Sequence, residues 1–217
     1  ASHVPAHVYP ENVRGAIAAG LRELGGETVE VSTACLDDPY QGLPGLALNE
    51  TEVLVWWGHR RHDELTDENS ARIVEHVCQH GLGFIALHSA HYSKPFTRLL
   101  KCTGDLKGGW NDVEQPEEVH VCAPRHPIAH GVPGFTLARE EMYAGPFDVP
   151  APDVVVFQSW FPAARESFPS GLCWTVGAGI DPHFRSGPGH GVGQGKGVGR
   201  VFYFRPGHET VLTYFNP

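Results

Sequence analysis

The sequence predicts an α/β domain built on a parallel sheet with right-handed crossovers. Apolar runs of strand length alternate with amphipathic segments of helix length, and the links between them are short. The 217 residues suit one large domain or at most two small ones. Since no repeat or linker-like stretch divides the chain, we expect residues 1–217 to form a single domain.

The first half of the chain carries the clearest alternation. We expect helices at residues 10–24, 66–80 and 93–101, and strands at residues 28–32, 51–57 and 83–87. Thr66 is a candidate helix N-cap, Gly81 a stop signal and Pro95 a first-turn residue. The near-continuous apolar run TEVLVWW at residues 51–57 is typical of a strand buried on both faces.

After Thr103 the pattern changes to strands with little helix between them. These strands are expected at residues 118–122, 153–160, 172–176 and 200–204. Nine glycines occur between Gly177 and Gly199, but the G-x-x-x-x-G-K-[ST] order of a phosphate-binding loop is absent there. We therefore interpret this stretch as a flexible surface insertion and expect no nucleotide cofactor.

Charge and cysteine content narrow the functional classes. The formal net charge of −9 argues against a nucleic-acid partner, which needs clustered Lys and Arg. The five cysteines form no C-x-x-C pair and are odd in number, so free thiols in a reducing cytoplasm are expected. We see no signal peptide and no apolar run of about 18 residues that would place the chain in a membrane.

Histidine is the unusual component: there are 14, nearly as many as Lys and Arg together. Ligands of open α/β sheets bind at the carboxyl ends of strands. Three predicted strands are followed directly by histidines, namely His59 and His62, His88 and His91, and His208. Because histidine is a common metal ligand and acid/base group, we expect a shared polar site at this edge.

Glutamate and serine residues are further candidate site residues near that edge. Adjacent residues of a strand face opposite sides, so at most one of Glu140 and Glu141 should enter the site; the neighbours of Glu141 favour Glu141. Ser89 follows a buried strand, as a nucleophile does in α/β hydrolases, although the flanking G-x-S-x-G glycines are missing.

These motifs together resemble the ThuA-like, or trehalose-utilisation, family over residues from about Tyr9 to the end of the chain. The matching stretches are Val55-Trp56-Trp57-Gly58-His59 with His62-Asp63-Glu64, Leu87-His88-Ser89 with His91 and Ser93-Lys94, His126-Pro127-Ile128 with Gly131, Glu140-Glu141-Met142-Tyr143, and Phe204-Arg205-Pro206-Gly207-His208-Glu209.

The resemblance implies a class I glutamine-amidotransferase-like fold, which is a flavodoxin-like three-layer sandwich with a mostly parallel sheet. It also implies a role in the breakdown of trehalose or a related disaccharide, beside an oxidoreductase that makes 3-keto-sugars. Relative to the family, the chain is expected to be short at both termini: a strand usually precedes Tyr9, and a helix usually follows Pro217.

Our first hypothesis is a metal-assisted enzyme that hydrolyses, eliminates or isomerises a sugar or 3-keto-sugar. A divalent metal, zinc or another transition metal, would be held by His59, His88, Glu141 and His208. His62 and His91 would transfer protons, and Trp57, Tyr143 and Arg205 would bind the sugar. Two alternatives stay open: a hydrolase with Ser89 as nucleophile, and a non-catalytic sugar-binding or regulatory protein. A homo-oligomer is compatible with all three.

Overall fold

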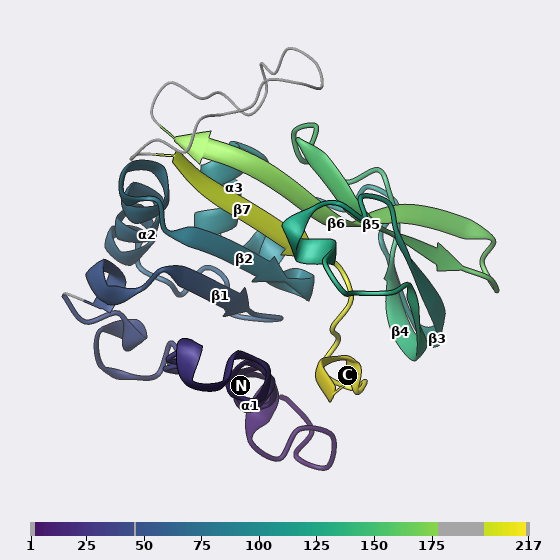
Figure 1. Ribbon diagram of the computed structural model, residues 1–217, viewed down its shortest axis with the longest axis horizontal. Helices are drawn as coiled ribbons and strands as arrows, with labels where there is room; N and C mark the ends of the chain where they lie inside the picture. The colour runs from purple at the N-terminus through teal and green to yellow at the C-terminus, as the bar shows by residue number, and fades with distance from the viewer. Residues whose placement is uncertain (1–2, 46, 178–197, 216–217) are drawn as a thin grey trace.

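The computed structural model describes residues 3–45, 47–177 and 198–215, which form one seven-stranded sheet in the order β1-β2-β7-β6-β5-β3-β4 (Figure 1). Strands β1 (Val53–Trp57), β2 (Gly83–Leu87) and β7 (Val198–Phe204) are parallel neighbours. Their carboxyl ends therefore meet at one edge of the sheet, as the sequence predicted for the histidine-bearing strands.

The other four strands are antiparallel. They are β3 (Trp110–Val121), β4 (Phe135–Tyr143), β5 (Val154–Phe161) and β6 (Glu166–Gly177). The mostly parallel, flavodoxin-like sheet expected from the resemblance is thus wrong, and the fold is α/β with a mixed sheet. Parallel pairing needs a long crossover, usually a helix, and no α-helix lies between β3 and β6.

Helices α2 (Asp67–His80) and α3 (Lys94–Leu100) cover one face of the parallel strands. Thr66 caps α2 by accepting a hydrogen bond from the backbone of Asn69, and Gly81 ends it in the left-handed conformation. Buried Phe84, Trp174 and Tyr203 lie in the core between these helices and the sheet. The helices predicted in these two regions are confirmed.

Helix α1 (Asn12–Gly25) packs beside Trp57 and Tyr214 through Val13 and Ala16, instead of covering the second face of the parallel strands. The three-layer sandwich is therefore incomplete within the described residues. The described residues include six short 3-10 helices. Three lie between α1 and β1, namely η1 (Gly26–Thr28), η2 (Pro39–Gly42) and η3 (Ala47–Glu50); η4 (His88–Tyr92) follows β2, η5 (Pro127–Ala129) lies between β3 and β4, and η6 (Thr213–Phe215) follows β7.

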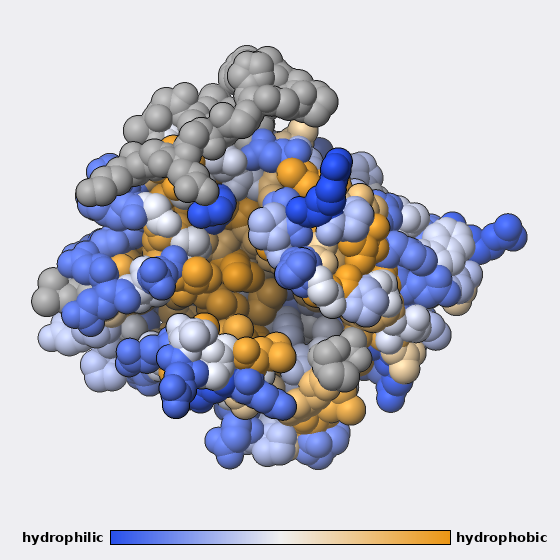
Figure 2. All heavy atoms as spheres, in the orientation of Figure 1, coloured by the Kyte–Doolittle hydropathy of each residue, from blue (hydrophilic) through white to orange (hydrophobic). Residues whose placement is uncertain are grey.

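Two strand predictions in the first half need correction. Residues 28–32 form no strand, because no described strand lies beside them to supply ladder hydrogen bonds, and Val29 is exposed. Strand β1 is not buried on both faces: it lies at the sheet edge, and Val53 is 50% exposed. Figure 2 shows apolar side chains gathered in a hollow over the parallel strands. Val55, Ile85 and Phe202 form one register row across these strands.

The glycine-rich insertion predicted at residues 177–199 lies mostly outside the described residues; its two ends complete β6 and begin β7. Among the described helices, none is both long and apolar enough to span a bilayer.

Candidate metal centre

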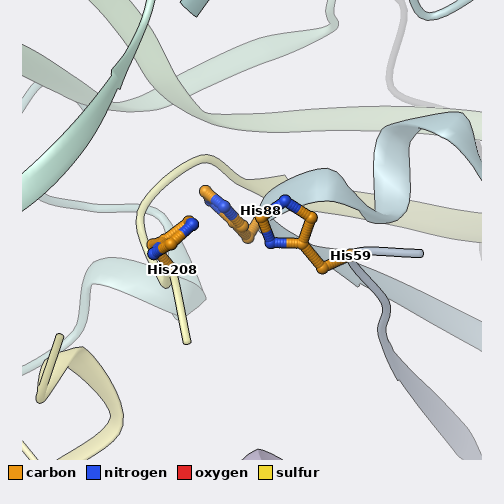
Figure 3. Close-up of side chains that lie close together, drawn as sticks. All are labelled: His59, His88 and His208. Atoms are coloured by element: carbon orange, nitrogen blue, oxygen red, sulfur yellow. The ribbon is translucent and has the colours of Figure 1, made fainter. Parts of the chain in front are cut away.

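Three histidines converge where the parallel strands end. His59 follows β1, His88 begins η4 directly after β2, and His208 lies in the loop after β7 (Figure 3). One ring nitrogen from each lies within 4.8 Å of the other two. The ring centroids are 4.9 to 5.6 Å apart. The parallel register of β1, β2 and β7 therefore assembles the cluster from residues up to 149 positions apart.

Hydrogen bonds orient the first two imidazoles. Nδ1–H of His59 donates to Oε2 of Glu209, and Nδ1–H of His88 donates to the carbonyl oxygen of Arg205 at 3.0 Å. In each ring this arrangement leaves the Nε2 lone pair free of a proton. Metal-binding histidines are held in this way by a carboxylate or carbonyl on the other ring nitrogen.

His208 is held differently. Its Nδ1 accepts a hydrogen bond from the backbone N–H of Thr210 at 3.3 Å and lies 2.7 Å from the Thr210 hydroxyl, which bonds to Oε1 of Glu114 at 2.5 Å. Glu114 is in turn ion-paired with Arg139. The arrangement in which Nδ1 donates, as in His59 and His88, is therefore not repeated at His208.

Two carboxylates lie against the cluster. Oε2 of Glu141, on β4, is 3.2 Å from Nε2 of His88 and 3.8 Å from Nε2 of His208. Oε2 of Glu209 lies 3.5 Å from Nε2 of His208 as well as bonding to His59. Burial alone would raise the pKa of Glu209, but the hydrogen bonds from His59 and the backbone lower it to about 2. An anionic cluster of this kind attracts cations.

Burial favours the neutral forms of His88 and His208. It lowers the pKa of His88 to about 4, and the neighbouring His59 acts in the same direction. Burial also lowers the pKa of His208, against the opposing effect of Glu209. Imidazole nitrogens and carboxylate oxygens form a donor set that suits zinc and other divalent transition metals.

A hydroxyl pair lies on the buried side of the cluster. The Tyr143 hydroxyl is 2.9 Å from Nε2 of His88 and 2.5 Å from the hydroxyl of Ser89, and its ring stacks on His88 with centroids 4.5 Å apart. Burial and the nearby Glu141 raise the pKa of Tyr143, so this phenol holds its proton at neutral pH. His88 itself has a φ of 52°, an uncommon left-handed conformation where the chain leaves β2.

Comparison with known proteins decides the family. The family model described as ThuA, trehalose utilisation, matches residues 7–217. The chain belongs to the ThuA family. A crystal structure of a ThuA-like protein from Parabacteroides merdae has the same fold, with a TM-score of 0.54 and 15% sequence identity over 88% of this chain and 73% of that one. A search of curated protein sequences found no match.

Among the predicted residues of this ThuA chain, His62 and His91 lie outside the three-histidine group. His91 is fully buried, and its Nδ1–H donates to the carbonyl oxygen of Gly104 at 2.7 Å. Burial lowers its pKa to about 3. His62 is partly buried, and its ring lies 6.1 Å from that of Tyr92, which in turn contacts His91. Both imidazoles are therefore neutral groups behind or beside the cluster.

Of the three predicted sugar-binding residues, one contacts the cluster and two support it from outside. The Tyr143 side chain contacts the cluster, whereas the Trp57 indole donates to the carbonyl oxygen of Gly207 at 3.1 Å and supports the His208 loop. Arg205 is only 3% exposed; its guanidinium donates to the carbonyl oxygen of Tyr143 and lies over Phe168. As placed, Arg205 supports the site from within the core.

Two residues near the centre received no separate role from the sequence. Glu209 follows His208 directly, and that adjacency was the available signal for its contact with His59. Glu140 is fully buried, and its carboxylate accepts hydrogen bonds from the backbone of Gly207 and His208. Alternation along β4 does turn Glu140 and Glu141 in different directions, yet both serve the same centre.

Proposed function

We propose that this ThuA-family protein is a metal-dependent enzyme of sugar utilisation that acts on a sugar or 3-keto-sugar. The observation that carries the proposal is the convergence of one ring nitrogen from each of His59, His88 and His208 within 4.8 Å of the other two, with Nδ1–H of His59 and of His88 directed to an acceptor. Histidines that served only the core would have no reason to gather three ring nitrogens within 4.8 Å of one another beside two carboxylates.

The donor chemistry fits a divalent metal. His59, His88 and His208 would supply three nitrogens, and Glu141 would supply an oxygen. A bound divalent cation would polarise a substrate carbonyl or lower the pKa of a coordinated water. Ionised Glu209 adds negative charge next to these ligands, so a neutral sugar is favoured over a phosphorylated one.

The geometry also defines a direction of approach. The side chains of His88 and Glu141 are 0% and 5% exposed, whereas those of His59 and His208 are 24% and 18% exposed. A substrate would therefore reach the centre from the side of His59 and His208. Tyr143, which holds its proton and contacts the buried side of His88, is placed to donate a hydrogen bond or a proton at that end.

The serine hydrolase receives less support. The hydroxyl of Ser89 bonds to Tyr143, not to a histidine, and the residue is 3% exposed. A nucleophilic serine needs a general base within hydrogen-bond reach of its oxygen. We therefore assign Ser89 to the support of Tyr143 in this proposal and keep the hydrolase as an outcome of the tests.

The reaction types that suit this centre are hydrolysis, elimination and isomerisation of an oxidised disaccharide. An oxidoreductase that makes 3-keto-sugars would supply the substrate. The five free cysteines are compatible with a reducing cytoplasm.

The deciding experiment combines metal analysis with an assay. Purified protein is analysed for bound metal, stripped with a chelator, and incubated with 3-keto-trehalose with and without added Zn²⁺, Mn²⁺ or Co²⁺. We expect one metal per chain and metal-dependent product formation. His208→Ala should lose both, and His126→Ala, at a histidine that caps η5 and is not one of the three in the cluster, should lose neither. Metal-free protein that ignores added cations would contradict the proposal, and sugar binding without product would favour the non-catalytic alternative.

A further inference from the structure

The loop that carries His208 and Glu209 is attached to the strand that carries Glu141 through one buried carboxylate. Glu140 is 0% exposed, and both of its oxygens are occupied. Oε1 accepts from the backbone N–H of His208 at 3.1 Å and of Glu141 at 3.0 Å. Oε2 accepts from the backbone N–H of Gly207 at 2.9 Å and from the hydroxyl of Thr213 at 2.5 Å.

We infer that Glu140 is a positioning residue that sets the distance between His208 and Glu141, and thereby the geometry of the metal centre. This inference rests on the proposed function. Glu140 is not itself a ligand, because four donors already satisfy its two oxygens. It acts on the centre through the backbone of two of the residues that form it.

The hydrogen bonds of the loop between β7 and η6 show why its backbone needs a partner such as Glu140. The loop between β7 and η6 has no strand partner of its own beyond Arg205, whose N–H donates to the carbonyl oxygen of Ser170. Past that point the backbone of Gly207 and the N–H of His208 bond to Trp57 on one side and to Glu140 on the other. The other described hydrogen bonds of the loop backbone are within the loop or join Val211 to Tyr9. Without Glu140, His208 would keep its own side-chain bond to Thr210 but lose its fixed distance from β4.

The conformation of the loop supports the same conclusion. Gly207 has a φ of 127°, and a Cβ atom built there would lie 1.9 Å from the hydroxyl oxygen of Tyr214. The chain therefore passes too close to the C-terminal turn for any other residue, and in this conformation the amides of Gly207 and His208 both point at Glu140. Two successive N–H groups on one carboxylate are a stronger constraint on a loop than a single side-chain bond.

The test uses Glu140→Gln with Glu117→Gln as its matched control. Glu117 is also a buried carboxyl group of the antiparallel strands, but its hydrogen-bond partner is Ser159 and not the His208 loop. For each variant we would measure Co²⁺ affinity by calorimetry, the visible spectrum of the Co²⁺ form, and hydrogen exchange at the amides of Gly207 and His208.

Glu140→Gln replaces one acceptor oxygen by a donor and should weaken Co²⁺ binding by roughly 10- to 100-fold, as loss of an outer partner does. It should also alter the Co²⁺ spectrum and remove exchange protection at both amides. Glu117→Gln should keep Co²⁺ affinity within twofold and the spectrum unchanged. Wild-type affinity and spectrum in Glu140→Gln would overturn the inference.

Glu140→Asp decides the question if Glu140→Gln does not fold. It keeps the charge but withdraws the carboxylate by one methylene group, so Co²⁺ affinity and spectrum should still change, and unchanged values would overturn the inference. A failure of the proposed function can be told apart from a failure of this inference about Glu140, because wild-type protein would then bind no Co²⁺ at this centre. Exchange protection at the two amides would still report whether Glu140 holds the loop.

Discussion

Nε2 of His88 lies 3.2 Å from Oε2 of Glu141, and both side chains are buried. Because burial lowers the pKa of His88 to about 4, the imidazole is neutral at pH 7 and the contact is not an ordinary salt bridge. A neutral imidazole nitrogen and a carboxylate oxygen both present lone pairs, so a hydrogen-bond donor or a cation between or beside them is favourable.

Glu209→Gln should weaken metal binding while keeping the fold. The amide accepts the hydrogen bond from His59 less strongly than the carboxylate does, and one negative charge leaves the centre. We expect metal affinity to fall roughly 10- to 100-fold by calorimetry. Glu118→Gln removes a carboxylate from an exposed pair with His120 and serves as the control; an equal loss in both variants would contradict a role for Glu209.

Tyr143→Phe should lower turnover more than stability. The variant keeps the ring stacked on His88 but removes the hydroxyl that contacts Nε2 of His88 and Ser89. If this hydroxyl moves a proton, kcat should fall roughly 10²- to 10⁴-fold, with a loss of about 1 kcal/mol in the free energy of unfolding. Tyr203→Phe changes a buried hydroxyl that has no hydrogen-bond partner among the described residues, and should leave kcat unchanged.

Ser89→Ala separates the metal enzyme from the serine hydrolase. The metal-dependent reaction needs no covalent bond to Ser89, so turnover should stay within roughly tenfold of wild type, because the variant leaves Tyr143 its contact with His88. Steady-state rates and bound-metal content are measured together. Abolished turnover with full metal content would favour the nucleophilic serine.

Gly207→Ala should destabilise the protein and disrupt the centre. The new Cβ would collide with the Tyr214 hydroxyl, and the φ of 127° is unfavourable for alanine. We expect a loss of about 2 to 4 kcal/mol in the free energy of urea unfolding. Gly20→Ala in α1, where a Cβ meets nothing within 4 Å, should instead gain up to about 1 kcal/mol. Similar behaviour of the two variants would contradict this reading of the loop.

Glu117 should make stability depend on pH. Burial and the nearby Glu140 raise its pKa to about 8, so the folded protein holds a proton that the unfolded chain releases above pH 4.5. This contribution is fully present below pH 4.5 and is lost as pH rises through 8. The stability of wild type relative to Glu117→Gln should therefore fall between pH 5 and 8, by at most about 1.4 kcal/mol per pH unit. A difference that is flat with pH would contradict the buried neutral acid.

Local signals predicted the parallel half of the fold well. Thr66 and Gly81 bound α2 as expected, and β2 coincides with its predicted range, because caps and short apolar runs are properties of neighbouring residues. Strand β4 was not predicted as an element, and residues 28–32 form no strand. Pairing with a partner far along the chain decides both cases, and no local pattern contains that partner.

The candidate site was also predicted only in part. His59, His88 and His208 were predicted to meet because each follows a strand of one sheet edge, and the structure brings them together. The contacts of Glu140 with Gly207 and of Glu209 with His59 join residues 67 and 150 positions apart. Such contacts depend on the curvature of the antiparallel half, which the sequence did not predict.

The strand order places β1 and β4 at opposite edges of the sheet, yet His59 after β1 and Glu141 on β4 belong to one centre. The sheet must therefore bend until its two edges approach each other. A ligand bound at this centre would contact residues from both edges and so link them. Its binding free energy would then add to the cooperative stability of the whole sheet, not to that of one loop. The centre would also exist only in a chain whose seven strands are all in place, so a half-folded molecule would carry no reactive site.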